Sequence, residues 1–244
     1  MDLIKVTAEI ISKSSSTLAL TGAGISAESG IPPFRGSGGL WGKYDPEEYA
    51  TIEAFHQDPE KVWTMLKELG EMIFRAEPND GHRALAELEE MGKLKSIITQ
   101  NIDGLHQKAG SRSVIEFHGN HRKVVCMSCR TRLDYESISL DILPPVCHCG
   151  GIFKPESVLF GEPIPHHALH SAFHDASECE ALLVIGTSAV VAPASQIPII
   201  AKQHGAKIIE VNTERTILTG TISDFFLEGS SSHILPLVLK MLKH

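Results

Sequence analysis

Short apolar runs rich in β-branched residues alternate along this chain with helical patterns, and no other sequence feature constrains its fold as strongly. The apolar runs predict strands over residues 17–21, 94–99, 114–117, 181–185, 207–211 and 224–227. The helical patterns predict helices over residues 3–14, 46–56, 59–75, 81–91, 165–176, 193–204 and 232–242. Because a repeated strand-then-helix order is typical of parallel sheets, we expect an α/β fold with a parallel sheet wrapped by helices.

Two stretches interrupt this alternation, and both lie between strands of the same predicted sheet. The first, over residues 31–78, is a loop followed by two helical patterns, and the second, over residues 120–157, carries four cysteines. We expect these insertions to form a smaller domain beside a larger one made of residues 1–30, 79–119 and 158–244. A cleft is expected between the two domains.

The charge balance limits the partners that this chain is expected to bind. Lys+Arg 22 against Asp+Glu 30 gives a formal net charge of −8, whereas nucleic acids and membrane surfaces attract a positive field. No run approaches the ~20 apolar residues of a membrane span, and Asp2 and Glu9 lie where a secretion signal would carry positive charge. We expect a cytoplasmic protein without direct contacts to nucleic acid or membrane, and nothing here indicates its oligomeric state.

Four of the five cysteines gather between residues 126 and 149. In a chain with no export signal, such clustering indicates a metal site rather than disulfides. Four thiolates at tetrahedral corners select zinc, and a site filled by protein ligands is structural. We therefore expect one structural Zn²⁺ held by Cys126, Cys129, Cys147 and Cys149, with His148 as an alternative ligand because the Cys147–Cys149 spacing is tight. Cys179 is expected to be an inert buried thiol.

A glycine-rich turn follows the first predicted strand. Gly22 and Gly24 would let the backbone approach a phosphate, whose charge is held by N–H groups at the start of a helix. The third glycine, Gly30, comes six residues after Gly24 instead of three, so the ordinary dinucleotide fingerprint of a dehydrogenase is not met. A tight turn without a ligand remains an alternative.

The segment from Gly30 to Trp41 contains glycines, prolines, one arginine and two aromatic residues. Ordering such a loop costs conformational entropy, and the composition is typical of a lid that a bound ligand orders. Arg35 could pair with a phosphate, and Phe34 could cover a reactive sugar carbon and exclude water. Ordinary anchoring of the loop is the alternative for both.

Polar residues follow several predicted strands at their carboxyl ends, where ligands bind in open α/β sheets. The run Gln100-Asn101-Ile102-Asp103 suits a carboxamide and a ribose, although Asp103 could instead cap a helix. His118 ends the next strand and is a candidate general base. Gly186-Thr187-Ser188 and Asn212-Thr213-Glu214 suit sugar hydroxyls.

Other histidines carry less information. His166, His170 and His174 have the four-residue spacing of one helix face. This is a possible metal face in principle, but without a companion motif we interpret it as surface. The roles of His106 and His121 are open.

Taken in order, these motifs closely resemble the sirtuin family of NAD-dependent protein lysine deacylases. The resemblance rests on residues 22–35, 100–103, 118–119, the four cysteines, residues 160–162 and residues 186–188, and it extends from about Leu3 to Leu242. It implies a Rossmann-like sheet that binds NAD as co-substrate, and a smaller domain made of a zinc ribbon and a helical insertion. NAD and an acyl-lysine protein would meet in the cleft between them.

The resemblance also implies roles for individual positions. It implies catalytic roles for His118, Asn101 and Asp103, with His118 as the base. The implied cofactor-binding residues are Gly22, Ala23, Gly24, Ala27, Phe34, Arg35, Trp41, Gln100, Asn101, Ile102, Asp103, Gly186, Thr187, Ser188, Asn212, Thr213, Glu214 and Ser231. The implied substrate-binding residues, between which a peptide would lie as an extra strand, are Val158, Phe160, Gly161, Glu162 and Val190.

The implied reaction removes acyl groups from protein lysines and yields nicotinamide, free lysine and O-acyl-ADP-ribose. Family members that remove acidic acyl groups have a Tyr and an Arg where this chain aligns Leu66 and Leu69. A buried carboxylate without a cation is costly, so we expect neutral acyl groups: acetyl first, with longer chains against Met65, Leu66, Leu69 and Met72. These four could instead be plain core. A protein ADP-ribosyltransferase or an NAD glycohydrolase with the same pocket is the alternative function.

Overall fold

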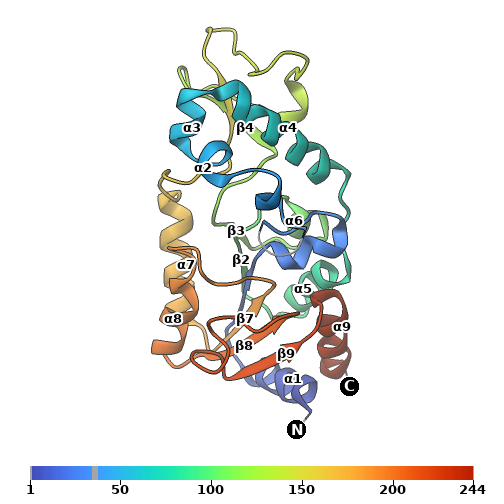
Figure 1. Ribbon diagram of the computed structural model, residues 1–244. Coiled ribbons are helices and arrows are strands. Elements are labelled where there is room, and N and C mark those ends of the chain that lie inside the picture. Colours follow the sequence, from blue (N-terminus) through green and yellow to red (C-terminus); the bar gives the residue numbers. More distant parts are fainter. Residues whose placement is uncertain (1, 35–37, 244) are drawn as a thin grey trace.

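The computed structural model describes residues 2–34 and 38–243 of the chain. Six parallel strands form one sheet in the order β3-β2-β1-β7-β8-β9 (Figure 1). Each overlaps one predicted strand, and their bounds are Thr17–Thr21 (β1), Ser96–Thr99 (β2), Val114–Glu116 (β3), Ala181–Ile185 (β7), Lys207–Asn212 (β8) and Phe225–Glu228 (β9). The predicted parallel sheet is therefore confirmed.

Helices cover both faces of this sheet. One face packs on α1 (Leu3–Lys13), α5 (Asp80–Glu90) and α9 (Ser231–Leu242), and the other on α7 (His166–Glu178) and α8 (Gln196–Gln203). Alternate residues of β1 serve the two cores, because Ala19 faces the first group while Leu18 and Leu20 face the second. Burial on both faces explains why the strands read as continuous apolar runs. None of the helices in the described residues is long and apolar enough to cross a membrane.

A smaller group of elements lies at one end of the large sheet (Figure 1). It comprises a three-stranded antiparallel sheet, β4 (Lys123–Cys126), β5 (Arg132–Asp134) and β6 (Phe153–Pro155), and the helices α2 (Pro46–Tyr49), α3 (Ile52–Gln57) and α4 (Pro59–Arg75). Trp63 of α4 joins these helices to the small sheet: it is fully buried, and its indole N–H donates to the carbonyl of Phe153 in β6 at 2.8 Å. The two insertions in the sequence thus share one core.

Several element boundaries differ from those predicted. The helix expected over residues 46–56 is two helices, because the Thr51 hydroxyl accepts the Ala54 N–H and starts a new one. The strand expected from residue 94 begins at Ser96, because the N–H groups of Lys93 and Leu94 donate to Leu88 at the end of α5. The short helix α6 (Leu105–Lys108) was not predicted.

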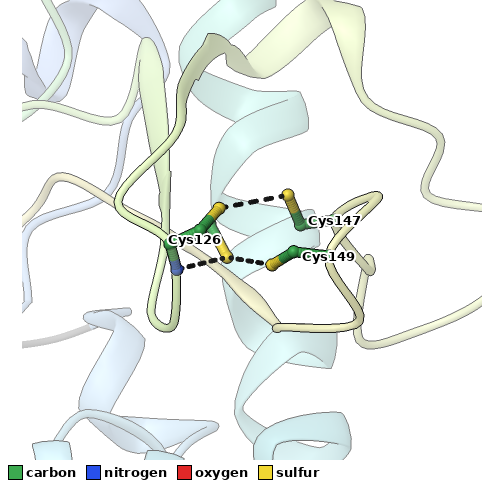
Figure 2. A group of neighbouring side chains, drawn as sticks. Cys126, Cys147 and Cys149 are labelled. Carbon is green, nitrogen blue, oxygen red and sulfur yellow. Dashed lines mark hydrogen bonds between the residues drawn. The ribbon is translucent and has the colours of Figure 1, made fainter.

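The four clustered cysteines meet at the outer end of the small sheet. Their sulfurs all lie within 4.8 Å of one another, with Cys126 Sγ 3.5 Å from Cys149 Sγ and Cys129 Sγ 3.7 Å from Cys147 Sγ. Figure 2 shows Cys126, Cys147 and Cys149 turned toward a common point. Zn–S bonds of about 2.3 Å in a tetrahedron put sulfurs roughly 3.8 Å apart, so the cluster fits a zinc ion. His148 is exposed, and although its Nδ1 lies 3.4 Å from Cys147 Sγ, it is not one of the four groups that converge.

We expect Cys147→Ser to lose the zinc and to lower the unfolding temperature, because the metal bonds tie the two halves of the ribbon together. Cys179→Ser is the matched control, since Cys179 is the one remaining cysteine and is buried away from the ribbon among the helices of the large sheet. Atomic emission should give one zinc per chain for the wild type and the control. A full zinc content in Cys147→Ser would contradict this assignment.

Candidate functional site

A cavity of about 1360 Å³ opens at the carboxyl edge of the large sheet. Its wall comes from the turns after β1, β2, β7 and β8, from the segment 157–164 and from α4. The predicted residues that line it are Gly22, Ala23, Gly24, Ala27, Phe34, Trp41, Gln100, Asn101, Ile102, His118, Val158, Phe160, Gly161, Glu162, Gly186, Thr187, Ser188, Val190, Asn212, Thr213, Glu214 and Ser231. Asp103 does not line the cavity, and Arg35 lies outside the described residues.

Two glycine turns meet at the floor of the cavity. The Gly24 N–H donates to the Gly186 carbonyl at 2.8 Å, and the Gly22 N–H donates to Ile185. A Cβ on Gly24 would lie 2.8 Å from the Gly186 Cα, and Gly186 itself has a φ of +56°. Because side chains would separate the two turns, both positions require glycine. A 3-10 helix, Ala23–Ser29, begins at this contact.

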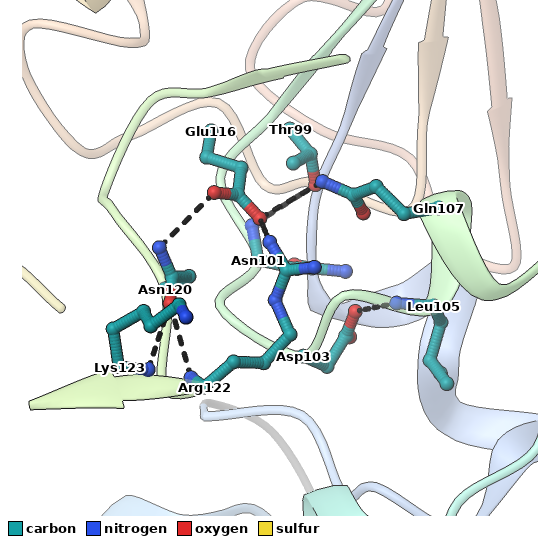
Figure 3. Close-up of polar contacts among 9 residues, drawn as sticks. All are labelled: Thr99, Asn101, Asp103, Leu105, Gln107, Glu116, Asn120, Arg122 and Lys123. Atoms are coloured by element: carbon teal, nitrogen blue, oxygen red, sulfur yellow. Dashed lines mark hydrogen bonds and ion pairs between the residues drawn. The ribbon is translucent and has the colours of Figure 1, made fainter. Parts of the chain in front are cut away.

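Asn101 is held by its amide nitrogen. Its Nδ2 donates to the Gly22 carbonyl and to Ser26 Oγ, both at 3.1 Å, so its Oδ1 is the group that faces the cavity. Ser26 in turn donates to Asp103 Oδ2 at 2.7 Å, and Asp103 Oδ1 accepts the Leu105 N–H (Figure 3). Burial raises the pKa of Asp103. Asp103 therefore holds Ser26, one of the two partners of the Asn101 amide, and Ser26 is a residue that the sequence analysis did not single out.

Two histidines complete the buried layer under Asn101. His106 Nε2 lies 2.9 Å from Thr21 Oγ1, and Thr21 donates to Thr99 Oγ1, which accepts the Asn101 backbone N–H. Burial lowers the pKa of His106 to about 3 and that of the neighbouring His82 to about 4. Both rings are thus neutral at neutral pH and add no charge beneath the cavity.

His118 is positioned by a hydrogen bond of its imidazole ring and by the turn that carries it. Its Nδ1 lies 3.0 Å from the Gln100 carbonyl, so Nδ1 carries the proton and donates, which leaves Nε2 as a free base. Burial lowers the pKa of His118, so the ring is neutral at neutral pH. Near the end of β3, the Glu116 carboxylate accepts from Gln107, Asn120 and Arg122 and braces the turn (Figure 3).

Lys154 braces the segment that follows the small sheet. It is 4% exposed, and its ammonium donates to the Pro155 carbonyl at 2.9 Å, to the Ser157 carbonyl at 2.8 Å and to Glu162 Oε2 at 2.9 Å. The same Glu162 oxygen accepts the Leu159 N–H. Glu162, expected to contact substrate, thus also folds the loop, and the Val158 N–H joins that loop to the His118 carbonyl.

A buried carboxylate, Glu210, braces the opposite end of the cavity. Glu210 of β8 is fully buried and accepts hydrogen bonds from the hydroxyls of Thr216, Thr219 and Ser223. Three donors satisfy its charge, as a buried carboxylate requires. The loop that Glu210 holds supplies Thr213, Glu214 and three further residues to the wall, Arg215, Thr216 and Ile217.

Apolar side chains line the part of the cavity next to the small sheet. Helix α4 contributes Met65, Leu66 and Leu69 and no charged residue, whereas Met72 does not line this cavity. The Trp41 ring centre lies 5.1 Å from that of Phe34 and 6.3 Å from that of Phe160, so three aromatic rings extend the apolar wall.

The remaining residues from the sequence analysis lie away from the cavity. His121 is fully buried beside Tyr135, and a Cβ on Gly70 would lie 3.1 Å from its Nε2, so this ring packs against α4. Burial raises the pKa of the Cys179 thiol to about 11, which makes it unreactive, as expected.

Comparisons with known proteins agree with this geometry. The profile of the Sir2 family matches residues 22–193. An NAD-dependent protein deacylase of Thermococcus kodakarensis is 47% identical over 97% of this chain and 94% of its own. A Sir2 homologue in complex with ADP-ribose is 44% identical, covers 100% of this chain and 97% of its own, and superposes with a TM-score of 0.95. Sir2Af2 bound to a myristoylated histone peptide is 40% identical over 99% of this chain and 97% of its own, with a TM-score of 0.84.

The family profile spans most of the chain, from the glycine turn after β1 to the turn after β7. The alignment with the Thermococcus kodakarensis deacylase covers 97% of this chain and so includes the small sheet and the helical insertion. The chain therefore belongs to the Sir2 family, the sirtuins.

Proposed function

We propose that this chain removes acetyl or other neutral acyl groups from protein lysines and consumes NAD in the reaction. The observation that carries the proposal is the neutral His118 ring, which borders the same cavity as Asn101 and the two glycine turns. The similar proteins support it, since one is named an NAD-dependent deacylase and others were solved with ADP-ribose or an acylated peptide. The proposed products are nicotinamide, free lysine and O-acyl-ADP-ribose.

The NAD molecule would lie along the carboxyl edge of the sheet and supply a positively charged leaving group, nicotinamide, at a sugar carbon. Backbone groups of the two glycine turns can approach its phosphates without side chains in the way. Asn212 and the loop held by Glu210 border the far end of the cavity and suit the adenosine sugar. Phe34 and Trp41 would exclude water from the reacting sugar carbon, so that the acyl oxygen of the lysine and not water forms the new bond as nicotinamide leaves.

His118 would act as the general base. Its free Nε2 can take a proton from a ribose hydroxyl, and the Gln100 carbonyl holds the ring in the tautomer that allows this. A base must be deprotonated before it acts, and burial keeps His118 so at neutral pH. We propose that Asn101 orients the nicotinamide end through Oδ1 and that Asp103 positions Asn101 through Ser26.

The substrate peptide would lie between Val158–Glu162 and Val190 as an added strand. Main-chain hydrogen bonds give such a complex affinity with little demand on peptide sequence. Phe160 and Val190 are 40% and 48% exposed and so remain available to a peptide. The acyl chain would pack against the apolar wall that α4 provides.

The residue bounds of the two domains and the cytoplasmic location remain predictions from the sequence.

We expect His118→Ala to lower the rate of acetyl removal by ~10²–10⁴-fold, the usual contribution of a general base. The measurement is mass spectrometry of an acetyl-lysine peptide incubated with and without NAD. The matched control is His233→Ala, a histidine of α9 that does not line the cavity. An unchanged rate in His118→Ala would refute the assignment of His118 as the general base. NAD consumption by the wild type without loss of acetyl would instead favour ADP-ribosyl transfer or NAD hydrolysis.

We expect a succinyl-lysine peptide to react ~10²-fold more slowly than an acetyl-lysine peptide, because its carboxylate would be buried against α4 without a cation. Leu69→Arg should raise the succinyl-to-acetyl ratio of kcat/KM by supplying that cation. Met72→Arg, one turn further along the same helix and off the cavity, should leave the ratio unchanged. Efficient removal of succinyl by the wild type would contradict the proposed preference.

We expect Lys154→Met to raise KM for the peptide about tenfold or more with a smaller change in KM for NAD, since Lys154 holds the peptide-facing loop. Lys154→Arg, which keeps the charge and several donors, should restore much of the loss. The control is Lys123→Met, an exposed lysine of β4 in the same small sheet. Equal rises in both KM values, or a loss of zinc from Lys154→Met, would show a general structural role instead.

A further inference from the structure

Three histidines form an exposed stripe on α7 that the catalytic site does not use. His166, His170 and His174 follow one another at four-residue spacing, and Glu178 continues the same spacing at the end of the helix. All four side chains are exposed. The ring centres of His166 and His170 lie 6.4 Å apart, and those of His170 and His174 lie 6.3 Å apart. We refer to these four residues as the histidine stripe.

The packing of α7 keeps the histidine stripe facing outward. The buried residues of the helix are Ala168, Ala172 and Ala176, which lie two positions from each histidine and thus on the opposite side of the helix. Ala172 and Ala176 pack in the core on one face of the large sheet, and α7 runs along one edge of the molecule in Figure 1. The imidazoles are therefore presented to solvent by a helix that the core holds rigidly.

Neighbouring rings of the stripe lie close enough for a change of side-chain rotamer to bring them onto one metal ion. An imidazole nitrogen bonds a divalent transition ion at about 2.1 Å, which puts the ring centre roughly 3.2 Å from the ion. Two rings on one ion have centres roughly 4.5–5.2 Å apart at the ligand angles usual in tetrahedral or octahedral sites, so each pair, now 6.4 and 6.3 Å apart, has to close by roughly 1–2 Å. The rings are now stacked, with interplanar angles of 21° and 26°, so exposed rotamers must turn to aim their nitrogens at one ion.

We propose that the histidine stripe binds a divalent transition cation of the class that prefers imidazole, namely Ni²⁺, Cu²⁺ or Zn²⁺. Two histidines at i and i+4 on a helix are a recognised ligand pair. His170 is shared by the two possible pairs, so it is the central ligand, and Glu178 can add a carboxylate to the pair of His170 and His174. The stripe is separate from the four cysteines, which lie in the small sheet.

The test measures the binding of Ni²⁺ by isothermal titration calorimetry. It uses the untagged chain with zinc bound to the four cysteines. We expect binding in the micromolar range for the wild type. His170→Gln should weaken it at least roughly tenfold, because that change removes a ligand from both pairs. His166→Gln and His174→Gln should each weaken it less, since one complete pair remains. The control is His167→Gln, which removes an exposed histidine beside the stripe.

The outcomes separate the stripe from other histidines. Absence of Ni²⁺ binding to the wild type, or an unchanged affinity in His170→Gln, would overturn the proposal. An equal loss in His167→Gln would overturn it as well, because the site would then not follow the four-residue spacing. Zinc content and the unfolding temperature in the absence of Ni²⁺ should be the same for all variants, which excludes misfolding as the cause.

Discussion

The close contact between two glycine turns is the constraint on which the functional site depends. The chain leaves β1 toward β2 and β3 on one side of the sheet, whereas β7, β8 and β9 lie on the other, so β1 and β7 flank the switch point of the sheet. Ligands bind at such a point because the connections diverge there and leave a crevice. The hydrogen bond from Gly24 to Gly186 brings the two turns together at its floor and keeps side chains out.

Around this floor, the residues of the site are held by groups behind them. Ser26 and Asp103 hold Asn101, the Gln100 carbonyl holds His118, and burial keeps the histidines of this layer neutral. Buried ions brace the two ends of the cavity instead: Lys154 holds the loop over residues 155–162 and Glu210 the loop after β8. Because each bracing ion has three partners, the loops are fixed before any ligand arrives, which lowers the entropic cost of binding.

Local sequence signals predict the sheet and most of the cavity wall, because both depend on the strands and on the residues directly after them. Gly22, Gln100, Gly186 and Asn212 could be placed together from the carboxyl-edge rule alone. Ser26, Lys154 and Glu210 could not, because their partners are set by tertiary contacts that no short window contains. The break at Thr51 has a local part, the cap on Ala54, and a part that no short window contains, the pairing of Thr51 with Phe160 from a distant part of the chain. Met72 has the helix spacing of Met65 and Leu69, yet it packs against a separate apolar cluster and does not line the cavity.

We propose that His118, Asn101 and the apolar wall together direct the acyl group of a lysine to the sugar of NAD and not to water. The most direct measurement is the stoichiometry of one reaction, with acetyl-lysine lost, nicotinamide released and O-acetyl-ADP-ribose formed all quantified in the same sample. We expect a ratio of about one to one to one, since a cavity that excludes water couples the three events. Nicotinamide release in large excess over acetyl loss, or free acetate in place of O-acetyl-ADP-ribose at the earliest times, would contradict it.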